Sequence, residues 1–205
     1  MLFKSKLTAV ALFITLALAA CAPVQQESLQ VELQFVTHPT ASMPEQDVYV
    51  QGDVEGEVVR AQLEETEQYM DAPVFATTKR IEHDPLVLGE DPFGPYEKGI
   101  DLDFTMGEWL AGTGTGVFTV TGDKADLELE LSNLVPNGVY TIWCATMILP
   151  PNFEIIDVPC GEADGSQNVV SAAADGTLSY SISMDALEPT TESSLNVIAA
   201  AYHSC

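Results

Sequence analysis

The sequence predicts a mainly β protein: an immunoglobulin-like or jelly-roll-like β-sandwich with one or two short helices in its N-terminal half. Three observations favour this class. Apolar and polar residues alternate along several short segments, turn residues separate these segments, and helical periodicity occupies only one sizeable stretch. Alternation with a period of two puts one face of a strand in the core and the other in solvent. Short strands divided by regular turns are typical of a sandwich.

The first half of the domain contains two predicted strands and one predicted helix. Residues 29–37 and 47–54 alternate between apolar and polar side chains, and prolines interrupt the chain between them. Over residues 57–70 the apolar spacing changes to i, i+4, i+7 and i+11, which is one stripe of an α-helix. The residues on this stripe are Val59, Leu63, Thr66 and Met70.

A compact loop and a short helical turn follow. Residues 83–99 are rich in proline and glycine, which predicts a loop. Thr105 and Glu108 have the spacing of a capping box, which opens a short helix carrying Trp109. The glycines of residues 112–116 end that helix and predict a flexible start to the next strand, because no basic residue follows that would suit a phosphate-binding loop.

The second half has the clearest strand pattern. Residues 125–132 alternate apolar and acidic side chains without exception until Ser132, and residues 140–149 are nearly all apolar or small. Residues 169–174 and 177–184 flank Asp175-Gly176, a pair that predicts a type I′ hairpin. Residues 195–202 form a last apolar strand.

One segment resembles a known structural motif. Leu131-Ser-Asn-Leu134-Val-Pro136-Asn-Gly-Val-Tyr140 is similar to the tyrosine corner of fibronectin type III and related immunoglobulin-like domains. The resemblance implies that the hydroxyl of Tyr140 bonds back to the connecting loop. Sixty-five residues follow Tyr140, more than a fibronectin module needs, so a larger sandwich or a jelly roll fits the chain equally well.

The N-terminus has the pattern of an export signal. Lys4 and Lys6 precede an apolar run over residues 7–20, which is shorter than the ~20 apolar residues of a membrane-spanning helix. Leu18-Ala19-Ala20-Cys21 resembles the lipobox of bacterial lipoproteins. The resemblance implies that Cys21 becomes the lipidated N-terminus of the mature chain. An uncleaved membrane anchor is the alternative.

These features predict a membrane-anchored extracytoplasmic protein, in the outer membrane or at the cell surface, because Ala22 replaces the aspartate that retains lipoproteins at the inner membrane. Residues 1–20 would be the signal peptide and 21–30 the lipidated tether. Residues 31–99 would be an α+β region, either a separate subdomain or a part wrapped on the sandwich, and 100–205 the sandwich core.

The charge of the chain excludes some partners. All 31 acidic residues and five of the seven basic ones follow the leader, so the mature net charge is about −26. Nucleic acids and anionic lipid surfaces require basic patches, and neither is therefore an expected partner. The carboxylates suit a cation or a basic protein partner, or adaptation to a salty medium; we favour adaptation because they are spread along the chain.

The cysteines predict one disulfide. Once Cys21 is lipidated, Cys144 and Cys160 can close a loop of fifteen intervening residues in an oxidising compartment, a constraint worth about 3 kcal/mol. We expect little regular structure in this loop. Cys205 is left over, and it is free, pairs between chains or displaces one partner of that bridge.

Candidate metal ligands are few and badly spaced. Glu162, Asp164 and Asn168 alternate as in a calcium loop, with Ser166 between the last two, but the acidic start and closing glutamate of such loops are missing. His203 and Cys205 could hold copper with a methionine, although their order differs from that of blue-copper proteins. The sequence therefore assigns no metal and no cofactor, and a solvated acidic turn is the simpler interpretation.

No catalytic motif stands out. No serine lies in Gly-x-Ser-x-Gly, and a triad of His83, Asp84 and a distant serine has no support in the spacing. We expect a binding or envelope-scaffolding protein without catalytic residues. A metal-binding protein and an envelope hydrolase with an unrecognised site are the alternatives.

Overall fold

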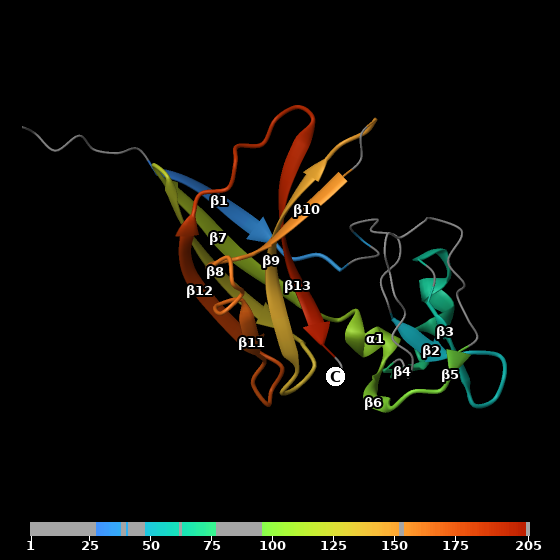
Figure 1. Cartoon of the computed structure of the whole chain (residues 1–205). Helices are drawn as coiled ribbons and strands as arrows, with labels where there is room; N and C mark the ends of the chain where they lie inside the picture. Colours follow the sequence, from blue (N-terminus) through green and yellow to red (C-terminus); the bar gives the residue numbers. More distant parts are fainter. Residues whose placement is uncertain are drawn as a thin grey trace, which may run out of the picture.

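The computed structural model describes residues 28–37, 40, 48–61, 63–76, 96–151 and 154–203. Their strands form three antiparallel sheets (Figure 1). Sheet A has the order β1-β7-β8-β12, and its strands are β1 (Ser28–Gln34), β7 (Thr113–Thr121), β8 (Lys124–Ser132) and β12 (Leu178–Asp185). The mainly β class that the sequence predicts is confirmed.

Sheet C is built around β9 (Val139–Ile148). On one side β9 pairs along its whole length with β13 (Ser194–His203). On the other side β10 (Glu154–Pro159) and β11 (Val169–Ser171) pair with successive parts of β9. The sheet is therefore three strands wide, and one of its edges is the ten-residue strand β13.

Sheet A and sheet C enclose the main hydrophobic core. The inward side chains of β8 alternate with exposed ones along the whole strand, as the sequence predicts. The fully or nearly fully buried members of this core are Leu127, Leu129, Leu131, Leu134, Tyr140, Ile142, Cys144, Cys160, Ala172, Leu178 and Tyr180. Two facing sheets with interdigitated inner side chains constitute a β-sandwich.

Glycines on β7 let sheet A pack closely. Gly114 and Gly116 lie within the strand, opposite Leu131 and Leu129. A Cβ atom at Gly116 would meet the Leu129 side chain at 2.5 Å and the carbonyl oxygen of Glu128 at 2.6 Å. The glycine-rich segment is thus part of the strand, and the absent side chains leave room for the leucines of β8.

A smaller sheet forms a subdomain between β1 and β7 in the sequence. Sheet B has the order β5-β3-β2-β4-β6. Its strands are β2 (Tyr49–Gln51), β3 (Glu57–Arg60), β4 (Pro73–Phe75), β5 (Tyr96–Glu97) and β6 (Asp101–Thr105). The 3-10 helix η1 (Leu63–Tyr69) and the short helix α1 (Met106–Trp109) accompany it, and Val48, Val50, Val74 and Met106 form a separate small core.

The helix expected over residues 57–70 is wrong. Residues 57–60 form β3, in which Val59 lies opposite Val50 of β2, and only residues 63–69 are helical, as a 3-10 helix. Met70, which the expected stripe placed in the core, is 41% exposed. Two adjacent β-branched valines favour a strand, and pairing with β2 and β5 outweighs the helical spacing.

Two further expectations are wrong. The segments flanking Asp175-Gly176 do not pair as a hairpin, because β11 joins sheet C through β9 whereas β12 joins sheet A through β8. The turn instead carries the chain from one layer of the sandwich to the other. The loop between Cys144 and Cys160 also contains regular structure, since β10 pairs with β9 over six residues. Most of the loop expected at 83–99 lies outside the described residues.

Candidate functional site

A hollow of about 1080 Å³ follows the free edge of β13, where the sandwich is open between sheet A and sheet C. Six consecutive residues of β13, 196–201, line it. The end of β1 and the residues after it, 32–37, form another part of the wall. Residues 103, 104 and 108–112, of which 108 and 109 belong to α1, and residues 133–136 of the loop before β9 close one end of the hollow.

The outer face of sheet C forms the floor of the hollow on one side. In the register of the sheet, Trp143 lies opposite Ala199, Ala145 opposite Val197 and Asp157, and Met147 opposite Ile155. Tyr140, Ile142 and Cys144 point into the core, so these alternate positions share the opposite face. Among these paired positions only Asp157 is charged and the others are apolar or aromatic, and Ala145 is only 5% exposed.

Four aromatic rings close one end of the hollow and join the subdomain to the sandwich. Tyr202 of β13 lies 5.5 Å from Trp109, 6.1 Å from Phe104 and 5.4 Å from Tyr140, measured between ring centroids. Phe104 and Trp109 stack on each other at 6.1 Å. Rings at these distances contribute about 0.5–1.5 kcal/mol per pair beyond the area that they bury.

The predicted capping box positions Trp109. The backbone N–H of Thr105 donates to the carboxylate of Glu108 at 2.8 Å, and the N–H of Glu108 donates to the hydroxyl of Thr105 at 3.2 Å. These two bonds satisfy donors that the first helical turn would leave unpaired. They start α1 at Met106 and so direct Trp109 towards Tyr202.

The tyrosine corner holds the loop at the same end. The hydroxyl oxygen of Tyr140 accepts a hydrogen bond from the backbone N–H of Val135 at 2.9 Å, the contact that the resemblance implies. Burial of the ring raises the pKa of Tyr140 to about 12, because the anion would be poorly solvated there. The corner therefore fixes the path of the chain from β8 in sheet A to β9 in sheet C.

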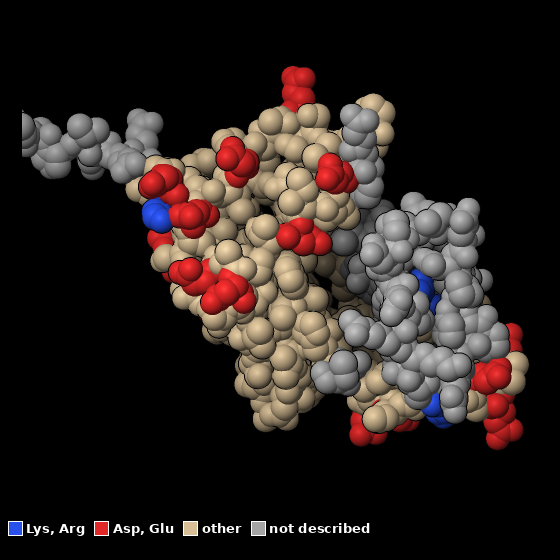
Figure 2. Space-filling view, viewed as in Figure 1, with Lys and Arg blue, Asp and Glu red and all other residues tan. Residues whose placement is uncertain are grey.

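The charged residues that line the hollow are all acidic. They are Glu32, Asp103, Glu108 and Asp157, and no lysine or arginine joins them among the described lining residues. No serine, cysteine or histidine lines the described wall either, and the remaining lining is mainly aliphatic and aromatic. Carboxylates are scattered across the face of the sandwich that Figure 2 shows.

A short chain of polar side chains borders Trp143. The indole Nε1–H of Trp143 donates to the hydroxyl oxygen of Thr141 at 2.8 Å, and this hydroxyl lies 2.8 Å from Nε2 of His203. The contacts cross from β9 to β13. These contacts hold Trp143 in one orientation at the wall of the hollow. His203, a candidate copper ligand from the sequence, takes part in this hydrogen-bonded group.

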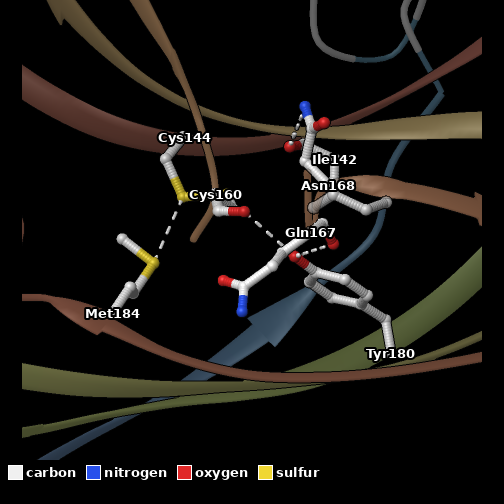
Figure 3. Close-up of a disulfide and its surroundings, with 7 residues drawn as sticks. All are labelled: Ile142, Cys144, Cys160, Gln167, Asn168, Tyr180 and Met184. Atoms are coloured by element: carbon white, nitrogen blue, oxygen red, sulfur yellow. Dashed lines mark hydrogen bonds between the residues drawn. A yellow bond between two sulfur atoms is a disulfide. The ribbon is translucent and has the colours of Figure 1, made fainter. Parts of the chain in front are cut away.

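The disulfide lies on the core side of sheet C (Figure 3). Cys144 and Cys160, the pair that the sequence predicts, are bonded and almost fully buried. The hydroxyl of Tyr180 donates to the carbonyl oxygen of Cys160 at 3.1 Å, and the sulfur of Met184 lies 3.8 Å from that of Cys144. Both Tyr180 and Met184 come from sheet A, so the bridge sits where the two sheets meet and has a structural role.

The candidate calcium ligands do not converge. The Asn168 side chain is buried, and its amide donates to the carbonyl oxygen of Ile142 at 3.3 Å (Figure 3). The carboxylate of Asp164 accepts from Ser166, and these hydrogen bonds lower its pKa. Glu162 is exposed. No cluster of three metal-ligating side chains occurs in the described part of the chain.

Several predicted site residues fall outside the structure's description. Cys21, which the lipobox assigns to the lipid, is one of them, and so are Cys205, His83 and Asp84. The described residues contain no helix long and apolar enough to cross a membrane.

The hollow itself is absent from the sequence expectations. The one signal that could have indicated it is the composition of β9, which is apolar or small at almost every position, whereas β8 alternates strictly. A strand that is apolar on both faces is covered on both faces. In sheet C one face meets the sandwich core and the other meets the hollow.

Comparison of the chain with protein-family models, with curated proteins and with solved structures finds no match. The class that fold and site define is therefore a β-sandwich with an appended small sheet and an apolar, acid-rimmed hollow along one sheet edge.

Proposed function

We propose that the chain is a lipid-anchored extracytoplasmic binding protein and that the hollow along β13 is its binding site. The observation that carries this proposal is the hollow, a concave and mostly apolar surface with a few polar groups, which is the usual character of ligand sites. Both tryptophans of the chain, Trp109 and Trp143, line it. Aromatic side chains of this kind dominate the energetics of recognition.

The proposed extracytoplasmic location rests on the signal-peptide pattern of residues 1–20 and on the disulfide. Leu18-Ala19-Ala20-Cys21 has the lipobox pattern, and a buried disulfide such as Cys144–Cys160 is typical of proteins outside the cytoplasm. Several acyl chains on Cys21 would hold the domain stably at a membrane. The net charge of about −26 supports the same conclusion, because a domain so acidic needs lipid rather than charge to stay there.

The direction of β1 orients the site. Ser28 begins β1 seven residues after Cys21, so the tether spans at most about 25 Å. The strand then runs about 20 Å to Gln34, and residues 32–37 line the hollow. A lipid on Cys21 would therefore hold the Ser28 end near the membrane and leave the hollow at the far end of β1.

The composition of the wall favours binding over hydrolysis. Its described residues provide carboxylates and threonines but no serine, cysteine or histidine as nucleophile or base. Acyl transfer by a nucleophile–base pair of the Ser–His or Cys–His kind requires such groups within hydrogen-bond reach of each other. Scaffolding without a ligand would leave the apolar outer face of sheet C without a role.

The binding site can be tested with the neutral apolar dye Nile red. The protein would be the chain from residue 21 with Cys21→Ser, which keeps every described residue and removes the lipid. We expect a blue shift of dye emission and a change in tryptophan fluorescence at the same dye concentration. Ala199→Phe, which fills the floor beside Trp143, should weaken dye binding at least about ten-fold.

The matched control is Ser181→Phe, which places the same ring on the exposed outer face of sheet A. It should leave the dye affinity of the hollow unchanged. Two results would refute the hollow as the dye site. One is equal dye affinity of Ala199→Phe and Ser181→Phe, and the other is no dye binding by the parent.

The anchor has a separate test. Expressed with its leader, the parent chain should partition into the membrane fraction, and its mature mass should exceed that of residues 21–205 by the mass of the lipid. Cys21→Ser should abolish both effects. A parent protein of unmodified mass in the soluble fraction would contradict the anchor without touching the hollow.

A further inference from the structure

The free edge of β13 carries unpaired backbone groups. In the antiparallel pairing of β13 with β9, the N–H of Leu149 donates to the carbonyl oxygen of Ser193 just beyond the end of the ladder. Hydrogen-bonded pairs recur at every second residue from there. Val197 and Ala199 therefore bond to β9, whereas the N–H and C=O groups of Asn196, Ile198 and Ala200 point away from it.

These outward groups have no partner among the described residues, and all three residues line the hollow. The side chains of Asn196 and Ile198 are half-buried, so the edge lies within the concavity rather than on an open surface. A strand edge that is uncovered is a template for pairing with another extended chain. The hollow thus offers a row of hydrogen-bonding groups between two apolar walls.

We propose that the hollow binds an extended peptide segment with alternating basic and apolar side chains, added as a strand to the free edge of β13. This inference rests on the proposed function and names the class of ligand. Main-chain bonds to Asn196, Ile198 and Ala200 provide affinity, and side-chain pockets on the two faces provide selectivity. The length of residues 196–201 fits about six residues of an added strand, or about 20 Å.

The walls on either side of the edge match the two kinds of side chain. Alternate residues of an added strand point to opposite faces of sheet C. One flank has Leu33, Phe35 and Leu131, and the other has Trp143, Ala145 and Met147. The first flank accepts the apolar side chains, and the second, where Asp157 lies opposite Ala145, accepts the basic ones.

The charge at the rim selects the remaining side chains. Asp103 lies on β6 of the subdomain, and Asp157 lies on β10, opposite Ala145 on the outer face of sheet C. With no basic residue among the described lining, these carboxylates favour lysine or arginine on the ligand. Aromatic faces such as that of Trp143 attract the same cations. A neutral or acidic strand would leave the carboxylates without partners.

The test uses an acetylated and amidated hexapeptide of alternating lysine and valine, titrated into the Cys21→Ser chain by calorimetry and by tryptophan fluorescence. We expect saturable binding and displacement of Nile red. A hexapeptide of alternating glutamate and valine should not bind. Asp157→Asn should weaken binding roughly two- to five-fold, the range for an exposed ion pair. Asp126→Asn removes the same charge from the outer face of sheet A and should have no effect.

Backbone methylation of the peptide tests strand addition with the protein unchanged. In an added strand, N–H groups of alternate peptide residues face β13. One peptide would be methylated at the backbone nitrogen of every lysine, and another at the backbone nitrogen of every valine. The two peptides should therefore lose affinity to unequal extents. One peptide should lose binding at least about ten-fold, and the other should stay within about two-fold of the parent.

A protein variant removes a backbone N–H from β13 instead of from the peptide. Ala200→Pro removes one outward N–H on the free edge, a position where proline is tolerated in a strand. It should weaken hexapeptide binding at least about ten-fold more than it weakens Nile red binding. If Nile red binds but the hexapeptide does not, or if both methylated peptides bind equally, the inference is overturned and the binding site stands. If neither ligand binds the parent, both proposals are overturned.

Discussion

Sheet A and sheet C bury one face each in the same core, and they differ in what their other faces do. The outer face of sheet A is polar throughout β8 and β12, where the hydroxyl of Ser179 donates to the carboxylate of Glu130 at 2.6 Å and Ser183 bonds Asp126. The outer face of sheet C has Trp143, Ala145 and Met147 at the corresponding positions. A solvated face needs no apolar side chains, so the apolar face of sheet C indicates that something covers or occupies it.

The two sheets also differ in construction. β7 and β8 pair without interruption over nine residues of each strand. Sheet C instead fills one side of β9 with two short strands, β10 and β11, and the disulfide ties the chain between them to β9. Sheet A is thus held by its ladder and core, and sheet C depends on a covalent link. On the other side of β9, β13 is the edge of sheet C next to the hollow.

The largest effect should come from removing that link. The double variant Cys144→Ala and Cys160→Ala should lose about 3 kcal/mol of unfolding free energy, because the closed loop no longer restricts the unfolded chain. Urea denaturation would measure the loss. Reductant should destabilise the parent to a similar extent and leave the double variant unchanged. A parent and variant with equal midpoints would show that sheet C does not need the bridge.

The next effect separates the two outer faces directly. Ala145→Asp should cost about 2–3 kcal/mol, because the new carboxylate is almost fully buried and lies opposite Asp157. Ser181→Asp introduces the same carboxylate on the outer face of sheet A, opposite Glu128, and should cost less than about 1 kcal/mol. Equal losses in thermal or urea unfolding would mean that the two faces are equally solvated.

A smaller effect is expected where the two sheets are joined. Tyr140→Phe leaves the N–H of Val135 without its acceptor and should cost about 1–2 kcal/mol in urea unfolding. The pKa of Tyr140 is raised to about 12 in the folded state, so the folded protein binds the proton more tightly than the unfolded chain. This stabilisation is complete below pH 10 and is lost as the pH rises towards 12.

The variant provides its own control for that pH dependence. The pKa values of Tyr180 and Tyr202 are also raised by burial, so the stability of Tyr140→Phe should still fall at high pH, but less steeply than that of the parent. Parallel stability curves above pH 10 would contradict the assignment of the buried hydroxyl.

The two sheets were also predictable to different degrees. Strict alternation located β8, and local residue chemistry located the capping box at Thr105 and the corner at Tyr140, since each depends on side chains within five positions of one another. The partners of β3 and β12 depend on residues far away in the chain. The valines of β3 pair with β2, so the helical spacing of residues 57–70 did not determine their secondary structure. The strand β12 pairs with β8, so the Asp175-Gly176 turn did not determine its partner.

The hollow was the least predictable feature. It forms from residues of β1, α1, β9, β10 and β13, and no local pattern in any of them specifies a cavity. The apolar run of β9 indicates burial on two faces but not what covers the second. The charge pattern likewise shows an acidic chain, and only the fold brings Asp103 and Asp157 to the hollow without a basic neighbour among the described lining residues.

Amide hydrogen exchange in the presence of the lysine–valine hexapeptide tests the central claim most directly, because it compares the free edges of the two sheets. The outward amides of β13, at Asn196, Ile198 and Ala200, should exchange more slowly when the peptide is bound. The free edge of β12 exposes the amides of Ser181 and Ser183, as the register with Asp123 and β8 requires, and their exchange should not change. Protection on both edges, or on neither, would contradict a peptide site on sheet C.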